Sequence, residues 1–332
     1  MAKAKQESID DILYCLSGIY QKAYAYTLRY KSILVCLSGG WDSDVMLDIL
    51  LTKSDNVKNM TFAFFDTGIE YDATKRHLAD LEKKYSIKIH HIKASMPVPL
   101  GCKKYGIPFL SKYVSEMIYR LQRNNFDFSK DGGSEYNELI KKYKHAKIAL
   151  KWWCNQNGEK SAFNIDRNYL LKDFLINNPP DFRISQKCCE GAKKLPAKNY
   201  EKNNIFDCKC TGVRKDEHGA RSTAYKNCFT YNPTAKTQNF RPIWWLTDAA
   251  KDFYTKKRRL TRSDCYIIYG MARTGCAGCP FGSNFENELT ILKRYEPKLY
   301  NAVINIFGKS YEYTRKYREY KENKKRELNN GK

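Results

Sequence analysis

Short runs of consecutive apolar residues alternate with segments of helical periodicity along the first third of the chain. Such runs, bounded by glycine or polar residues, are typical of strands that are buried on both faces. A continuous apolar run predicts a strand at residues 32–37, and segments with less regular apolar content predict strands at residues 60–65 and 87–92. The apolar spacing predicts helices at residues 9–30, 44–51 and 71–85. Because the two kinds of element alternate, the pattern favours an α/β fold with a doubly wound parallel sheet.

The periodicity is weaker in the rest of the chain. Helices are predicted at residues 136–153, 169–176 and 248–254. Residues 190–240 are rich in lysine, asparagine and glycine, and we expect them to be mostly irregular. Residues 311–332 alternate charged residues with tyrosine and predict a solvated helix that frays. The alternative for this tail is an arm that follows a nucleic acid.

A glycine-bearing turn, Ser38–Ser43, joins the first predicted strand to a helix. Glycine lets the backbone turn tightly and approach a ligand closely. Backbone N–H groups at the start of the helix, together with the helix dipole, attract an anion such as phosphate. The hydroxyls of Ser38 and Ser43 can add hydrogen bonds, and Asp42 can orient a magnesium ion or the loop itself. The alternative is an ordinary strand-to-helix turn that is capped by serine or aspartate.

The turn resembles the PP-loop of the ATP pyrophosphatase superfamily, whose pattern is Ser-Gly-Gly-x-Asp-Ser, at all five specified positions. This resemblance implies an adenine nucleotide alpha hydrolase-like fold, with ATP and Mg²⁺ bound at the loop. It also implies reaction at the α-phosphate of ATP, which gives an adenylylated acceptor and pyrophosphate. The residues assigned to nucleotide binding are Ser38, Gly39, Gly40, Trp41, Asp42 and Ser43. Asp42 is also assigned a catalytic role.

The turn after the second predicted strand resembles the Asp-Thr-Gly-x-Glu stretch of the PAPS reductase branch of that superfamily. The matching residues are Asp66, Thr67, Gly68 and Glu70, with Thr74 further along. The resemblance implies that this turn also binds the nucleotide, with its carboxylates placed to meet a ribose or a metal. The alternative is a polar turn that caps the next helix.

A loop that begins at Gly212 resembles the Gly-x-Arg-x-x-Glu-Ser…Arg loop of the same branch. This resemblance implies catalytic roles for Arg214 and Arg221, whose guanidinium groups can grip phosphate through two hydrogen bonds each. His218 stands where the family pattern has serine, so the hydroxyl of that position is missing here. The alternative is a solvated basic loop. Arg273 is a weaker candidate for the same kind of contact.

Twelve cysteines in a chain without a signal-peptide pattern indicate metal or redox chemistry rather than disulfides. The tandem pair Cys188 and Cys189 and the C-x-x-C pair Cys276 and Cys279 together supply four soft ligands for Zn²⁺ or an iron–sulfur cluster. This arrangement resembles the pattern that holds a 4Fe-4S cluster in assimilatory adenylylsulfate reductases. The alternatives are zinc and incidental cysteines. Cys208 and Cys210 form a second candidate pair, as replacement ligands or as a sulfur-carrying thiol.

Composition adds a strongly basic surface. The 59 lysines and arginines against 36 acidic residues give a net charge of +23, which attracts polyanions such as nucleic acid. The alternative is a surface that only confers solubility. The run Lys256–Arg259 is a candidate contact for a phosphate backbone, and the five tryptophans are expected to be mainly packing residues. No apolar run is long enough for a membrane helix, so we expect a cytoplasmic protein with no membrane contact.

These features predict four parts of the chain. They are an N-terminal helix at residues 1–30, a PP-loop nucleotide-binding α/β domain at 31–180, a cysteine-rich cluster and arginine-loop region at 181–285, and a basic C-terminal helical tail at 286–332.

Three functions compete. The first is ATP-dependent sulfur transfer to a nucleic-acid or nucleotide acceptor, which the unaltered PP-loop and the charge favour, with a sulfur-donor protein such as a cysteine desulfurase as a partner. The second is a sulfonucleotide reductase acting on adenylyl sulfate or its 3′-phosphorylated form, which the cysteine pattern favours. Those reductases use a cysteine near the C-terminus, whereas the last cysteine here is Cys279. The third is a non-enzymatic nucleotide- or nucleic-acid-binding regulator.

Overall fold

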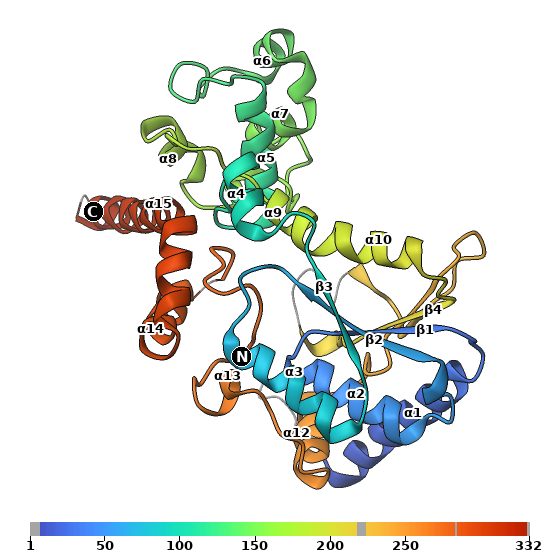
Figure 1. Ribbon diagram of the computed structural model, residues 1–332. Coiled ribbons are helices and arrows are strands. Elements are labelled where there is room, and N and C mark those ends of the chain that lie inside the picture. The colour runs from blue at the N-terminus through green and yellow to red at the C-terminus, as the bar shows by residue number, and fades with distance from the viewer. Residues whose placement is uncertain (1–6, 218–223, 283, 331–332) are drawn as a thin grey trace. The chain divides into compact units, whose positions relative to one another are not determined.

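The computed structural model describes residues 7–217, 224–282 and 284–330 (Figure 1). The chain divides into two units, each built from two separate stretches of sequence. The first unit comprises Met1–Ala94 and Leu195–Cys276, and the second comprises Ser95–Lys194 and Ala277–Lys332. Residues after 194 return to complete the sheet of the first unit.

The first unit contains a six-stranded sheet with the order β3-β2-β1-β4-β6-β5. Its strands are β1 (Ile33–Leu37), β2 (Met60–Asp66), β3 (Ile89–Lys93), β4 (Cys208–Thr211), β5 (Phe229–Thr230) and β6 (Gln238–Phe240). All neighbouring strands are parallel except β5, which is antiparallel to β6. The strand order reverses between β1 and β4, and ligands of such sheets bind at the carboxyl ends of the strands beside this point.

Alternation along β1 explains why both faces of the sheet are covered. Ile33, Val35 and Leu37 lie in the large core, whereas Leu34 and Cys36 lie in a smaller apolar cluster on the opposite face. The helices on the side of the large core are α1 (Ile9–Thr27), α2 (Trp41–Lys53), α3 (Asp72–Tyr85) and α12 (Asp248–Lys257) (Figure 1). On the other side is α10 (Leu195–Asn203). The doubly wound α/β architecture is therefore confirmed.

The carboxylate of Asp48 joins three elements of the large core. It is 1% exposed on α2 and accepts hydrogen bonds from the hydroxyl of Tyr254 (2.6 Å), the hydroxyl of Tyr85 (2.8 Å) and Nε of Arg258 (2.9 Å). Burial raises the pKa of Asp48, but these hydrogen bonds outweigh it and hold the pKa below its usual range. The charged carboxylate is therefore stabilised in the folded protein.

We expect Asp48→Ala to lower the free energy of unfolding by about 3 kcal/mol at neutral pH, because it leaves buried donors without their acceptor. The folded-state pKa is depressed, so the contribution is complete above the unfolded-state pKa of about 3.9 and is lost as the pH falls through the folded-state value. Urea unfolding at neutral and acidic pH measures both effects. The exposed Asp55→Ala variant is the control and should change stability by less than about 0.5 kcal/mol.

The second unit is helical. Its helices are α4 (Val98–Tyr105), α5 (Lys112–Arg123), α6 (Tyr136–Lys142), α7 (Lys147–Trp153), α8 (Leu171–Asn177), α9 (Lys187–Cys189), α14 (Phe285–Tyr295) and α15 (Pro297–Asn330). Aromatic residues dominate its core, with Trp152, Trp153 and Phe174 fully buried. None of the helices in the described ranges combines the length and apolar content needed to span a bilayer.

Three local predictions differ in detail from the structure. The helix predicted at 136–153 is two helices, since Tyr143 has a non-helical backbone and a short 3₁₀ turn, Lys144–Ala146, separates α6 from α7. Within residues 190–240 the structure also holds α10 and three short strands, which the sequence did not predict. The tail is a helix, but one face of its first half is buried rather than solvated: Tyr311, Tyr313 and Tyr317 are buried in the second unit.

Candidate functional site

A cavity of about 620 Å³ lies in the first unit, where β1 and β4 end side by side. Its volume is in the range of small-molecule sites. The lining comes from four segments: the turn after β1, the loop after β4, the first turn of α12, and residues 266–274. Polar and charged members of the lining include Ser38, Asp42, Ser43, Arg214, Lys251 and Arg273. The cavity therefore stands at the position that the strand order favours for a ligand.

The turn Ser38–Ser43 has the geometry of an anion-binding loop. Gly39 has a φ of +65°, and a Cβ there would lie 2.7 Å from Cγ2 of Thr74, so glycine is required on both counts. The N–H of Ser38 donates to Oγ of Ser43 (3.0 Å), which closes the loop. The N–H groups of Asp42 and Ser43 belong to the first turn of α2, where helix geometry provides no intrahelical acceptor. These groups are available to a phosphate at the cavity.

A buried pair of side chains, His77 and Asp44, joins α3 to the helix that follows the loop. Nε2 of His77 on α3 lies 2.8 Å from Oδ2 of Asp44 on α2, and both side chains are less than 5% exposed. Burial raises the pKa of Asp44. Burial alone would lower the pKa of His77, but the hydrogen bond and charge of Asp44 raise it. The pair fixes α3 against the first turn of α2, beside the loop.

The arginine loop after β4 packs directly on this turn. A Cβ on Gly212 would lie 3.1 Å from Cα of Ser43 and 3.2 Å from its backbone nitrogen. Gly212 is therefore needed for close approach of two backbones, whereas the sequence suggested only a turn.

Four charged side chains form a closed network that we call the ion ring: Asp42, Arg214, Asp248 and Lys251. Oδ1 of Asp42 accepts from Nε of Arg214 (2.8 Å) and lies 3.1 Å from Nζ of Lys251. Oδ1 of Asp248 accepts from Nη2 of Arg214 (2.8 Å) and lies 3.5 Å from Nζ of Lys251. Although partial burial raises the pKa of Asp248, the hydrogen bond and charge of Arg214 lower it overall.

Two contacts outside the ion ring hold its cations in place. Nη1 of Arg214 donates to the carbonyl of Leu246 (2.9 Å). Nζ of Lys251 lies 4.1 Å from the centre of the Trp41 ring, whose Nε1 donates to Thr255 (2.9 Å). Since Oδ1 of Asp42 already meets two cations, the contacts favour a role for Asp42 in organising the loop over a role as a magnesium ligand.

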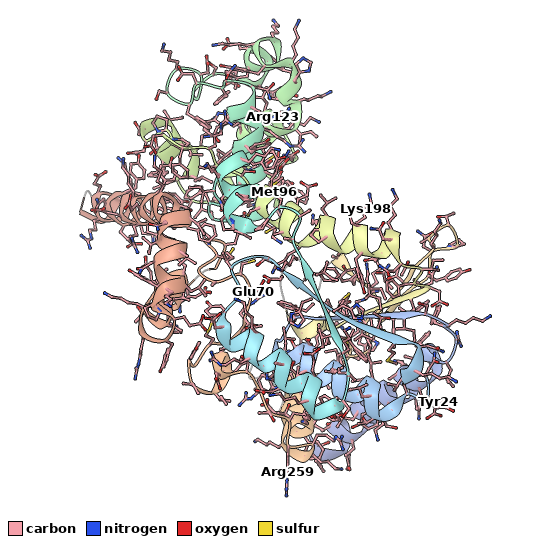
Figure 2. The ribbon with its side chains drawn as sticks, in the orientation of Figure 1. Tyr24, Glu70, Met96, Arg123, Lys198 and Arg259 are labelled. Atoms are coloured by element: carbon pink, nitrogen blue, oxygen red, sulfur yellow. The ribbon has the colours of Figure 1, made fainter. Side chains whose placement is uncertain are left out.

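The predicted residues of the second turn do not line the cavity. Asp66, Thr67, Gly68 and Glu70 form a turn that is closed on itself after β2. Oδ1 of Asp66 accepts from the N–H of Gly68 (2.8 Å), and Oε1 of Glu70 accepts from the hydroxyl of Thr67 (2.5 Å). Figure 2 labels Glu70 in this turn, ahead of α3.

Three of the four predicted metal ligands belong to the second unit. Cys188 is within hydrogen-bonding reach of Cys189 and of Cys102, and the hydrogen bond with Cys102 contributes most to raising its pKa. Cys279 is near enough for its charge to act on Cys188. Helices α4 and α9 approach closely here, since a Cβ on Gly101 would lie 3.1 Å from Cα of Cys188. Sequence analysis did not identify Cys102 as part of this group.

The fourth predicted ligand, Cys276, belongs to the first unit, where its thiol donates to the hydroxyl of Thr67 (3.6 Å). Within the described residues, no three Cys, His, Asp or Glu side chains are arranged to hold a metal ion. The thiols have the right chemistry for an iron–sulfur cluster or zinc. The alternative pair fits less well, because Cys208 and Cys210 are fully buried in the large core.

Some of the remaining candidate residues line the cavity and others do not. Arg214 lines the cavity, and so does the exposed Arg273. Arg221 and His218 lie outside the described residues. Trp152, Trp153 and Trp244 are buried packing residues, as expected, whereas Trp41 lines the cavity and Trp245 is 39% exposed. Sequence analysis missed Asp248, Lys251, Tyr266 and Thr274, which reach the cavity from the segment after the sheet.

Parts of this chain are similar to known proteins. Residues 32–115 match the family described as the phosphoadenosine phosphosulfate reductase domain. An uncharacterized protein of Methanocaldococcus jannaschii is 31% identical over 108 residues, which cover 32% of this chain and only 22% of that protein. The crystal structure of phosphoadenylyl-sulfate reductase from Candida auris, a phosphate complex, is similar with a TM-score of 0.42 and 14% identity, over 82% of this chain and 97% of that one.

Proposed function

We propose that this chain, whose residues 32–115 belong to the phosphoadenosine phosphosulfate reductase domain family, binds ATP in the cavity and cleaves it between the α- and β-phosphates. The observation that carries the proposal is the intact Ser-Gly-Gly-x-Asp-Ser loop, Ser38–Ser43, lining a cavity that also holds the buried cations Arg214 and Lys251. Backbone N–H groups and two fixed cations suit a polyphosphate.

In the proposed reaction an acceptor oxygen attacks the α-phosphorus of ATP, and pyrophosphate leaves. The loop and the two cations stabilise the charge that develops on the departing phosphates, because they are positioned before the reaction begins. Mg²⁺ would enter with the ATP phosphates. A sulfur nucleophile then displaces AMP from the adenylylated acceptor. The sulfur step is supported by the family resemblance alone.

The acceptor is proposed to be a nucleic acid or a nucleotide, in keeping with the net charge of +23. A sulfur-donor protein such as a cysteine desulfurase would supply the sulfur. We also propose a 4Fe-4S cluster at Cys188, Cys189, Cys276 and Cys279, with zinc as the alternative. The support is the thiol chemistry of these residues and the proximity of three of them within the second unit. No step of the reaction is derived through this cluster.

The test is an assay of the native protein with ATP, Mg²⁺, a bulk RNA or DNA acceptor, and sodium sulfide as the sulfur nucleophile that releases AMP. We expect AMP and pyrophosphate in equal amounts, in a reaction that depends on the acceptor. Adenylyl sulfate and its 3′-phosphorylated form, supplied with a reductant, are the parallel substrates. Sulfite release from either, without AMP formation from ATP, would replace the proposal with a sulfonucleotide reductase. Nucleotide binding with no turnover of any substrate would favour a regulator.

A further inference from the structure

We propose that Arg214 and Lys251 are a phosphate-binding cation pair, and that the carboxylate of Asp248 occupies the position of a phosphate group until a polyphosphate displaces it. The inference rests on the proposed function, because it assumes that the cavity receives the phosphates of a nucleotide. It adds two residues to the site and assigns opposite effects to them.

The two carboxylates of the ion ring differ in their surroundings. The side chain of Asp42 is 23% exposed and belongs to the PP-loop itself, at the first turn of α2. The side chain of Asp248 is 70% exposed, on the first residue of α12. A carboxylate that faces solvent recovers its hydration when it turns away from its partners, so releasing it costs little. Asp248 is therefore the member of the ring that a ligand can displace most easily.

The two cations of the ion ring, unlike Asp248, are buried. The side chains of Arg214 and Lys251 are 4% and 9% exposed, and a buried cation needs an anionic partner. Their contacts with Asp42, Leu246 and Trp41 do not involve Asp248. Both cations would thus stay in position after Asp248 leaves, with hydrogen-bonding capacity directed into the cavity.

A phosphate group suits the vacated position better than a carboxylate does. Nη2 of Arg214, which Asp248 would leave, can donate to one phosphate oxygen, and the ammonium group of Lys251 can bind another. Phosphate also carries more negative charge than the single carboxylate that it replaces. Asp216 and Glu217 also line the cavity, so its lining is not uniformly basic. The affinity for phosphate therefore depends on the exchange of the Asp248 carboxylate for a phosphate group.

Titration calorimetry with inorganic pyrophosphate tests the proposal without requiring turnover. Asp248→Asn should bind pyrophosphate at least threefold more tightly than the native protein, because the competing charge is gone. Lys251→Met should bind it at least tenfold more weakly. The matched controls lie on the same helix and are exposed: Asp252→Asn and Lys256→Met carry the same charge changes and should stay within twofold of the native affinity.

Equal or weaker binding by Asp248→Asn would overturn the proposal, and so would an equal gain in Asp252→Asn, which would indicate a general charge effect. Absence of pyrophosphate binding in every variant would also overturn it. Asp248 is mostly exposed, so this arm does not depend on a destabilised core. A gain in Asp248→Asn without AMP formation by the native protein would contradict the proposed reaction and leave this inference intact. AMP formation by the native protein without a gain in Asp248→Asn would support the proposed reaction and contradict this inference.

Discussion

Replacing Asp42 by asparagine is expected to slow the formation of AMP from ATP by at least about 100-fold. The physical reason is the position of Asp42 between two cations. Its Oδ1 fixes Nε of Arg214 at 2.8 Å and Nζ of Lys251 at 3.1 Å, while its backbone forms part of the PP-loop. Asparagine keeps the size of the side chain but not the charge, so the cations lose the anion that aligns them with the loop.

The effect should fall mainly on the rate of the reaction. The backbone N–H groups of the loop remain, and both cations keep other contacts, so the affinity for ATP should change by less than about tenfold. Rapid-quench measurements of AMP and pyrophosphate, with binding measured separately, separate the two quantities. Asp55→Asn is the matched control, since it removes a charge from an exposed position of the same unit. A native rate in Asp42→Asn would show that the loop does not organise the reaction.

Strands β1 and β2 could be predicted because each is contiguous and mostly apolar, and β3 could be predicted because isoleucines recur through residues 87–92. Strands β4, β5 and β6 could not, since they are two to four residues long, and β4 is defined by pairing with β1, which lies far away in the sequence. A weak signal was present in β4, where Cys208 and Cys210 face the large core and the charged Lys209 lies between them. Such a short alternation is decisive only once its partner strand is known.

In the candidate site, too, the contiguous residues could be predicted and the residues joined by long-range contacts could not. The PP-loop is contiguous, so its residues and its position between a strand and a helix could be read directly. The ion ring joins residues that are far apart along the chain: Arg214 is 172 residues from Asp42, to which it donates. Lys251 shares one sequence signal with the ring, since it lies three residues after Asp248 on α12, but nothing in that spacing pointed to Asp42. Long-range ion pairs of this kind depend on the packing of the sheet.

Replacing Cys188 by serine is expected to remove essentially all of the iron from protein that is purified without oxygen. Cys188 lies among the thiols of Cys102, Cys189 and Cys279, so its loss affects the centre of the group. A serine hydroxyl does not replace a thiolate as a ligand of iron, because the cluster is held by thiolates. The native protein should contain about four irons and four sulfides per chain and should absorb in the visible range. Iron, sulfide and zinc assays on the same samples measure the effect.

Cys154→Ser is the matched control, since Cys154 is a half-buried cysteine of the same unit that packs against its aromatic core. This variant should keep all of its iron. Cys102→Ser then decides whether the thiol that sequence analysis missed is a ligand in place of Cys276: if it is, Cys102→Ser loses iron and Cys276→Ser retains it. Full iron in Cys188→Ser would contradict the assignment of this group. One zinc and no iron in the native protein would make the site structural and would remove the main support for sulfur chemistry, leaving an ATP-dependent adenylylating enzyme.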